Sequence, residues 1–263
     1  MHCNTGTSMK KIVFLKAVAY DSLNETIRQY LRPFLNEDTD LHVRSLKRGP
    51  MHLEYEFYQA IAAQEMIRET LQAEKEGFDA LVISCFDDLH LYTLREVSRG
   101  MIITAPEEAS LLLATGLGDG YSVITPNDKC IPHMRENAEK YGLAGKLRSF
   151  RSLRGDVLGM QDESHIKERM CEEIDMAITS DGAEVIVLGC TMQFGYYQEL
   201  QKQFKIPVID PMIAAVKHAE YLLELKQKTG WDISRKNLYL APPRAEMKAW
   251  SLEEDYDLNG LLY

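Results

Sequence analysis

The chain contains two copies of one pattern, in which a long amphipathic segment, a glycine and an apolar stretch are followed by a cysteine. The first copy ends at Cys85 and the second at Cys190. The glycines, Gly77 and Gly182, stand where a helix is expected to end. A helix–strand unit that recurs in this way predicts two similar α/β halves in one chain.

Short apolar runs alternate with longer amphipathic runs along the whole chain. We expect strands at 12–18, 41–46, 80–84, 101–104, 121–125, 146–150, 185–189 and 207–209. We expect helices at 23–35, 54–76, 91–99, 106–115, 131–141, 163–180, 196–204 and 213–228. This alternation predicts parallel sheets with right-handed crossovers, so the expected fold class is α/β with two pseudo-symmetric, Rossmann-like domains.

The expected domain boundary is the glycine-rich turn at 115–120. We therefore expect a first domain at 10–117, completed by 213–263, and a second domain at 118–212. Residues 1–9 are small and polar, and we interpret them as a disordered leader. The tail from 231 onward could pack on the first half or bridge to another subunit.

Charge and cysteine usage exclude several functions. The formal net charge is −10, which disfavours nucleic acids and anionic membranes as partners and leaves a small molecule as the expected one. No apolar run is long enough to span a membrane, and no apolar core of a secretory signal begins the chain. Five cysteines without a CxxC pair indicate reduced thiols and a cytoplasmic location. The histidines form no metal-binding motif, so no metal site is expected.

Cys85 and Cys190 are the candidate catalytic residues, because ligands of open α/β sheets bind beyond the carboxyl ends of the strands. Each cysteine precedes a polar turn and then a helix, and the free N–H groups and partial positive charge of the helix N-terminus are expected to lower the pKa of the thiol. Two facing thiols can take a proton from one side of an acidic carbon and return one to the other, without a cofactor. The alternative is that both are small core residues. The remaining cysteines (Cys3, Cys130 and Cys171) lack this context and are expected to be structural.

Polar residues beside the two cysteines are candidates for substrate binding. Phe86 and Asp87 follow Cys85, and Thr191 follows Cys190. Turn amides at these positions could bind an oxygen that gains charge as the carbon acid ionises. Asp87 could instead cap a helix. Thr125 ends another expected strand and has the same topological position.

Several motifs resemble the aspartate/glutamate/hydantoin racemase superfamily, and most closely its hydantoin racemase branch. The most specific is the run Gly189-Cys190-Thr191, with Asp210-Pro211 further on. The resemblance covers about residues 10 to 225. It implies an active site in the cleft between two domains, and a two-base mechanism without cofactors in which Cys85 and Cys190 are the acid and the base. It also leaves a homo-oligomer open.

The end of the first expected strand departs from this branch, whose members usually carry asparagine there. Lys16 replaces the asparagine, and Tyr20 follows shortly after. Lys16 could pair with a substrate carboxylate. Equally, Lys16 could point into solvent while Tyr20 lines the pocket. The departure makes a hydantoin one candidate substrate beside an amino acid or a related carboxylate.

The sequence favours a racemase or epimerase, and two alternatives stay open. One is a decarboxylase or a maleate-type cis–trans isomerase on the same fold, in which one cysteine attacks or protonates the substrate. The other is a non-catalytic small-molecule binding protein, for which the altered first strand is the support.

Overall fold

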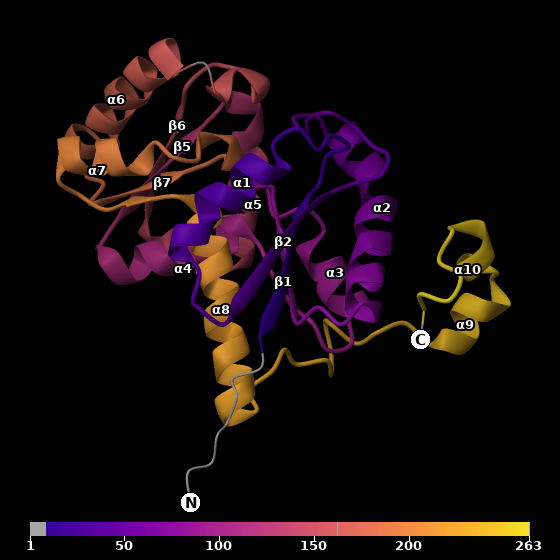
Figure 1. Ribbon diagram of the computed structural model, residues 1–263. Helices are drawn as coiled ribbons and strands as arrows, with labels where there is room; N and C mark the ends of the chain where they lie inside the picture. Colours follow the sequence, from indigo (N-terminus) through magenta and orange to yellow (C-terminus); the bar gives the residue numbers. More distant parts are fainter. Residues whose placement is uncertain (1–8, 162, 263) are drawn as a thin grey trace, which may run out of the picture.

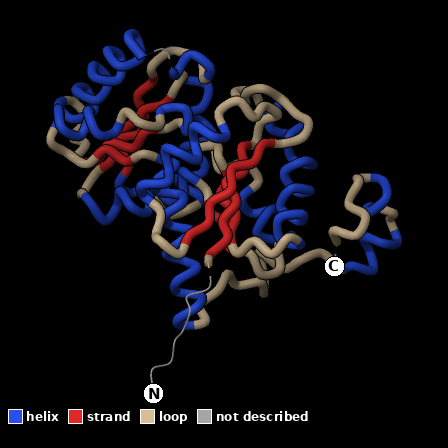
Figure 2. The backbone as a smooth tube through the Cα atoms, viewed as in Figure 1, coloured by secondary structure: helices blue, strands red, loops and turns tan. Residues whose placement is uncertain are grey.

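Two separate groups of strands, each surrounded by helices, make up the body of the molecule (Figure 2). The computed structural model describes residues 9–161 and 163–262. The predicted leader, residues 1–9, lies outside the described residues except for Met9, which is exposed.

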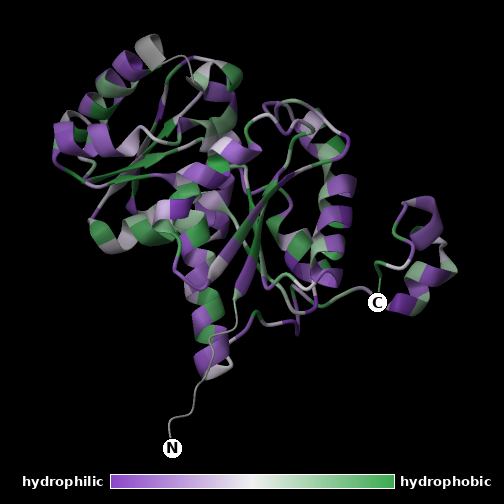
Figure 3. Cartoon of the chain, viewed as in Figure 1, coloured by the Kyte–Doolittle hydropathy of each residue, from purple (hydrophilic) through white to green (hydrophobic). Residues whose placement is uncertain are grey.

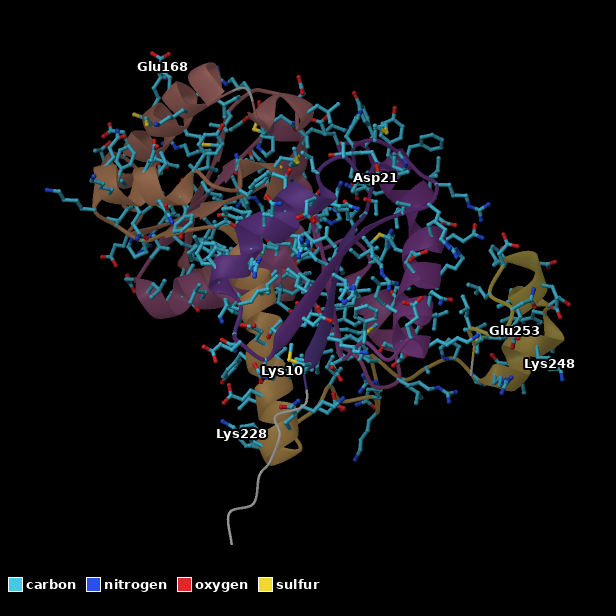
Figure 4. The ribbon with its side chains drawn as sticks, viewed as in Figure 1. Lys10, Asp21, Glu168, Lys228, Lys248 and Glu253 are labelled. Carbon is cyan, nitrogen blue, oxygen red and sulfur yellow. The ribbon has the colours of Figure 1, made fainter. Side chains whose placement is uncertain are left out.

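The first sheet has the strand order β2-β1-β3-β4, and every pairing in it is parallel. Its strands are β1 (Lys10–Lys16), β2 (Thr39–Ser45), β3 (Ala80–Ile83) and β4 (Ile102–Thr104). In the register of the central strand, Phe14 lies opposite Val43 on one side and Val82 on the other. Lys10 at the start of β1 and Asp21 beyond its end lie at opposite ends of the sheet along the strand direction (Figure 4).

The second sheet repeats the same order, as β6-β5-β7-β8, again with parallel pairings. Its strands are β5 (Tyr121–Thr125), β6 (Leu147–Ser152), β7 (Val185–Leu188) and β8 (Val208–Ile209). The identical order confirms the predicted α/β fold of two pseudo-symmetric halves. In both sheets the cysteine-bearing strand, β3 or β7, is an inner strand.

Helices connect the strands and cover both faces of each sheet (Figure 1). Those of the body are α1 (Asn24–Leu31), α2 (Glu56–Lys75), α3 (Leu91–Val97), α4 (Pro106–Leu117), α5 (Ile131–Lys140), α6 (Glu163–Thr179), α7 (Tyr197–Phe204) and α8 (Pro211–Thr229). The glycines predicted to end helices, Gly77 and Gly182, have φ of +81° and +72°. These values lie in the left-handed region that glycine tolerates best, just beyond α2 and α6.

Apolar side chains fill both faces of the inner strands, which are largely green in Figure 3, whereas the edge strands β2 and β6 carry more polar residues. Every residue of β3, β5 and β7 is buried, as expected for parallel strands covered by helices on both sides. One apolar cluster contains Phe14 and Val82 of the first sheet together with Val123 and Val187 of the second. The core therefore runs from one half of the molecule into the other.

Helix α8 follows the last strand of the second sheet but packs against the first. It contacts α4 and the strands β1, β3 and β4. The Thr104 hydroxyl donates to the Ala215 carbonyl at 3.1 Å. Glu220, almost fully buried, accepts hydrogen bonds from the Asn36 N–H and the Thr39 hydroxyl. The exact domain limits of 10–117 and 118–212 remain a prediction.

The tail beyond α8 lies against the first half, which is one of its two predicted placements. It contains α9 (Arg244–Ala249) and α10 (Leu252–Asp255), which stand beside α2 and carry the labelled Lys248 and Glu253 (Figures 1 and 4). Met247 and Leu258 form a small apolar cluster with Leu71 of α2.

Several predicted boundaries differ from the structure by a turn. The first strand begins at Lys10 and ends at Lys16, two residues earlier at each end than predicted. Beyond Lys16 the chain leaves the sheet, and the Val18 carbonyl accepts a single further hydrogen bond from the Leu46 N–H. The first helix ends at Leu31, where a 3₁₀ turn that contains Pro33 replaces the α-helix.

Candidate active site

The two predicted cysteines lie at equivalent positions of the two sheets. Cys85 follows β3 and Cys190 follows β7, both at the carboxyl ends of the strands. The Thr191 hydroxyl lies 3.5 Å from the Ser84 carbonyl oxygen, so the two cysteine turns touch across the boundary between the halves.

Gly189, just before Cys190, allows strand β7 to lie close to strand β5. Its N–H donates to the Ile124 carbonyl at 2.8 Å. A Cβ atom at this position would stand 2.9 Å from that same oxygen and 2.8 Å from Val123 Cγ1. Only glycine allows β7 to run this close to β5 and still deliver Cys190 to the end of the strand.

A cavity with an empty volume of about 680 Å³, part of it open to solvent, lies between the two halves. Its walls include most of the predicted site residues, namely Lys16, Tyr20, Cys85, Phe86, Asp87, Cys190 and Thr191. The remaining walls are mainly apolar: Val18, Ile27, Met51, Leu53, Pro126, Met134, Val157, Met192 and Met212. The fold therefore gathers residues from the carboxyl ends of β1, β3, β5 and β7, from the loop before α2 and from several helices around both thiols.

The surroundings of both thiols favour the protonated form over the thiolate. Burial raises the pKa of Cys85 well above its usual value, and the Asp87 carboxylate adds to the effect. Burial also raises the pKa of Cys190 to about 12, although the Met192 N–H, 3.4 Å from its sulfur, acts in the opposite direction. The expectation of a lowered thiol pKa at a helix N-terminus therefore has the wrong net sign, because desolvation of the thiolate outweighs the backbone N–H groups.

Lys16 ends β1 inside the molecule rather than in solvent, with 4% of its surface exposed. Its ammonium donates to the Tyr20 carbonyl at 2.7 Å and lies 4.1 Å from the centre of the Tyr20 ring. Burial lowers the pKa of Lys16 to about 8. The pKa of the Tyr20 phenol is raised by burial and by Cys190. The alternative in which Lys16 points into solvent therefore does not hold, and Lys16 and Tyr20 both line the cavity.

Asp87 lines the cavity and does not cap a helix. Its Oδ2 accepts from the Gln59 side chain at 3.2 Å, whereas its Oδ1 is buried with no hydrogen-bond partner in the described part of the chain. Burial raises the pKa of Asp87 to about 6. Phe86 is buried in the core and contributes part of the wall.

The neighbouring residue, Asp88, caps the N-terminus of helix α4. Its two carboxylate oxygens accept from the N–H groups of Glu107 and Glu108 at the start of α4, both at 2.7 Å. The Tyr141 hydroxyl of the second half donates to the same carboxylate. Asn137, also on the second half, donates to Glu107. Burial raises the pKa of Asp88 to about 8 and that of Glu107 well above its usual value.

Thr125, a predicted substrate-binding residue, ends β5 directly beside the cavity wall but is not among the residues that form it, and it is fully buried. Its hydroxyl donates to the Asn127 carbonyl at 3.1 Å, so it stabilises the turn after β5. Pro126, the next residue, contributes to the wall instead.

Sequence patterns missed the loop before α2 and one cysteine. Met51, His52 and Glu54 lie on the wall, and Glu54 accepts from the Asn127 side chain of the other half at 2.7 Å. A loop has no hydrophobic period, so no pattern pointed to it. Cys130, expected to be structural, also lines the cavity. Cys171 lies elsewhere on α6, and Cys3 falls outside the described residues.

Within the described ranges, 9–161 and 163–262, no cluster of three or more histidine, cysteine, aspartate or glutamate side chains could hold a metal ion. Over the same ranges, the helices are too short or too polar to cross a membrane.

Solved structures share this architecture. An allantoin racemase from Klebsiella pneumoniae superimposes with a TM-score of 0.82 and is 27% identical, over 89% of this chain and 94% of that one. An allantoin racemase from Pseudomonas fluorescens gives the same TM-score at 26% identity. The fold is therefore that of the two-domain α/β racemases, which are isomerases.

Sequence comparison gives the family. The model of the Asp/Glu/hydantoin racemase family matches residues 19–219. A hydantoin racemase of Rhizobium meliloti is 36% identical over 185 residues, which are 70% of this chain and 75% of the relative. The chain belongs to the Asp/Glu/hydantoin racemase family, as the sequence motifs predicted. The tail lies beyond the match.

Proposed function

We propose that the chain is a cofactor-independent racemase or epimerase that inverts an acidic chiral carbon of a hydantoin, an amino acid or a related carboxylate. Cys85 and Cys190 are the acid and the base. The observation that carries this proposal is that one cavity has a thiol from each pseudo-symmetric half on its wall. The hydantoin and allantoin racemases that resemble the chain support the same reaction.

The mechanism needs one thiolate and one thiol at a time. The thiolate removes the proton from the substrate carbon, and the opposite thiol donates its proton to the other face of the resulting carbanion. This leaves the two cysteines with exchanged protonation states and the carbon inverted. Since burial keeps both thiols protonated, a thiolate forms at a cost. The N–H groups that point at the sulfurs reduce that cost, because they stabilise the charged form.

The other residues of the wall hold the substrate. Lys16, Tyr20, Asp87 and Thr191 supply polar groups at the same strand ends as the thiols, and Phe86 supplies apolar surface.

The described cysteines (Cys85, Cys130, Cys171 and Cys190) are free, which supports a reducing compartment.

Serine variants test the proposal. Single enantiomers of candidate carbon acids are incubated with the protein in deuterated water, and exchange and optical rotation are followed. We expect Cys85→Ser and Cys190→Ser each to lower kcat/KM by about 100- to 10,000-fold. Cys171→Ser, on the outer helix α6, is the matched control and should retain full activity. Full activity in both active-site variants would refute the two-thiol mechanism.

A further inference from the structure

We propose that Lys16 and Asp87 form the two ends of a charge-selective clamp: Lys16 binds a carboxylate on the reacting carbon, and Asp87 binds an N–H group on that carbon. The proposal rests on the racemase function above and names its substrate class. That class is the open-chain α-amino acids and their N-carbamoyl derivatives, rather than neutral rings.

The cationic end of the clamp is a buried ammonium without an ion pair. Lys16 Nζ has three donors, and the Tyr20 carbonyl accepts one of them. Asp21, whose charge acts on Lys16, is exposed, and in the described part of the chain no acidic side chain comes within 4.0 Å of the Lys16 ammonium. Removing an ammonium from water without a counter-ion is costly. A substrate carboxylate would occupy the free donors and offset that cost.

The anionic end is a buried carboxylate with one oxygen unused. The Asp87 side chain is 6% exposed, and only its Oδ2 receives a hydrogen bond among the described residues. The Asp87 carbonyl is already engaged by the Asn137 side chain at 2.9 Å. Its Oδ1 is therefore the acceptor left for a ligand, and a carboxylate pairs best with an N–H donor, above all a charged one.

The two ends are not paired with each other, although both line the cavity that holds the two thiols. The reacting carbon of an α-amino acid carries a hydrogen, a carboxylate, a nitrogen and a side chain. The thiols take the hydrogen, Lys16 the carboxylate and Asp87 the nitrogen. The methionines of the wall (Met51, Met134, Met192 and Met212) offer adaptable apolar surface to the side chain.

A neutral hydantoin ring satisfies this arrangement less well. It presents a neutral carbonyl oxygen where Lys16 carries a full charge, so the buried ammonium would remain without a counter-ion. The carboxylate is thus the group that the charge of Lys16 selects.

Three compounds with the same benzyl side chain separate the possibilities: phenylalanine, N-carbamoylphenylalanine and 5-benzylhydantoin, each as a single enantiomer. Exchange at the chiral carbon in deuterated water gives kcat/KM for each. We expect at least one open-chain compound to exceed the ring by about 10-fold or more. Lys16→Met should lower the value for that compound by about 30-fold or more, whereas Lys16→Arg keeps most of it. Asp87→Asn should also lower it.

Lys11→Met is the matched control, since Lys11 lies on the same strand with an exposed side chain; it should change nothing. Melting temperatures show whether each variant folds. Faster turnover of the ring, unaffected by Lys16→Met, would overturn the clamp but leave the racemase function standing. Absence of exchange with all three compounds would overturn the racemase function and the clamp together.

Discussion

At the scale of single residues, the candidate site is defined by titratable groups that the fold buries away from water. Two thiols, one ammonium and one carboxylate line one cavity. Burial raises the pKa of the thiols and the carboxyl and lowers that of the ammonium, so that it favours the neutral form of each group. The chemistry therefore depends on how much of each group is in its active form at a given pH.

The pH profile should show this directly for a carboxylate substrate. The thiolate fraction rises tenfold per pH unit, because the pKa of Cys190 is about 12 and that of Cys85 is also raised. The charged fraction of Lys16, whose pKa is about 8, falls tenfold per unit above that value. We expect log kcat/KM to rise with unit slope between about pH 6, above which the Asp87 carboxyl is ionised, and about pH 8, and then to level off.

Lys16→Arg provides the control for that break, because a guanidinium stays charged throughout the range. In this variant the rise should continue beyond pH 8. A wild-type profile that is flat between pH 6 and pH 8 would contradict the account, since it would mean that a thiolate is already fully formed.

The position of a residue along its strand determined how much of the candidate site could be predicted from the sequence. The placement of Cys85, Cys190 and Lys16 at one cavity could be predicted because each lies at the end of a strand, and strand ends converge in an α/β fold. The same rule brought Thr125 to the edge of the cavity but not onto its wall, because its hydroxyl donates to a backbone carbonyl of its own turn. The sign of the thiol pKa was missed because desolvation depends on residues that are distant in the sequence.

At the scale of elements, the approach of β7 to β5 determines where Cys190 stands. Gly189→Ala should destabilise the protein by about 1–3 kcal/mol, because its Cβ would meet the Ile124 carbonyl at 2.9 Å, and backbone cannot give way cheaply. Thermal unfolding measures this effect. Gly116→Ala, in helix α4 with no atom within 4 Å of its Cβ, is the control and should be neutral or stabilising. Equal stability of the Gly189 variant and wild type would contradict this view of the strand.

The junction between α4 and the cysteine turn should make stability depend on pH. Asp88 and Glu107 have raised pKa values in the folded protein, so the folded state keeps protons that the unfolded state releases. Their contribution is present at low pH and is lost as pH rises, from about 4 to about 8 for Asp88. We expect the free energy of unfolding to fall across this window, as measured by urea titration at several pH values. Glu107→Gln should make the fall smaller; an unchanged slope would count against it.

At the scale of the whole molecule, the alternation of strands and helices predicted both sheets and their parallel pairing. The strands, bounded by glycine, proline or aspartate, were placed within a few residues because a buried parallel strand must be apolar on both faces. The loop 51–54 and the tail helices were not predicted, because neither has the hydrophobic repeat that marks a core element.

The tail should contribute stability but no chemistry. Met247 packs in a cluster with Leu71, and no residue beyond α8 lines the cavity among those described. We expect Met247→Ala to cost about 2–5 kcal/mol of tail docking and to expose the tail to proteases, with kcat/KM unchanged. Limited proteolysis followed by mass spectrometry checks this; a large loss of activity in an otherwise folded variant would argue against it.

The central claim is that two thiols work from opposite sides of one carbon. The most direct test is a short incubation of a single-enantiomer substrate in deuterated water, with both enantiomers recovered and analysed for deuterium. Because the thiol that donates to the product is not the one that took the substrate proton, the account predicts deuterium in the product enantiomer while the recovered substrate stays protiated. Equal deuterium in both enantiomers from the start would show a single base and contradict the account.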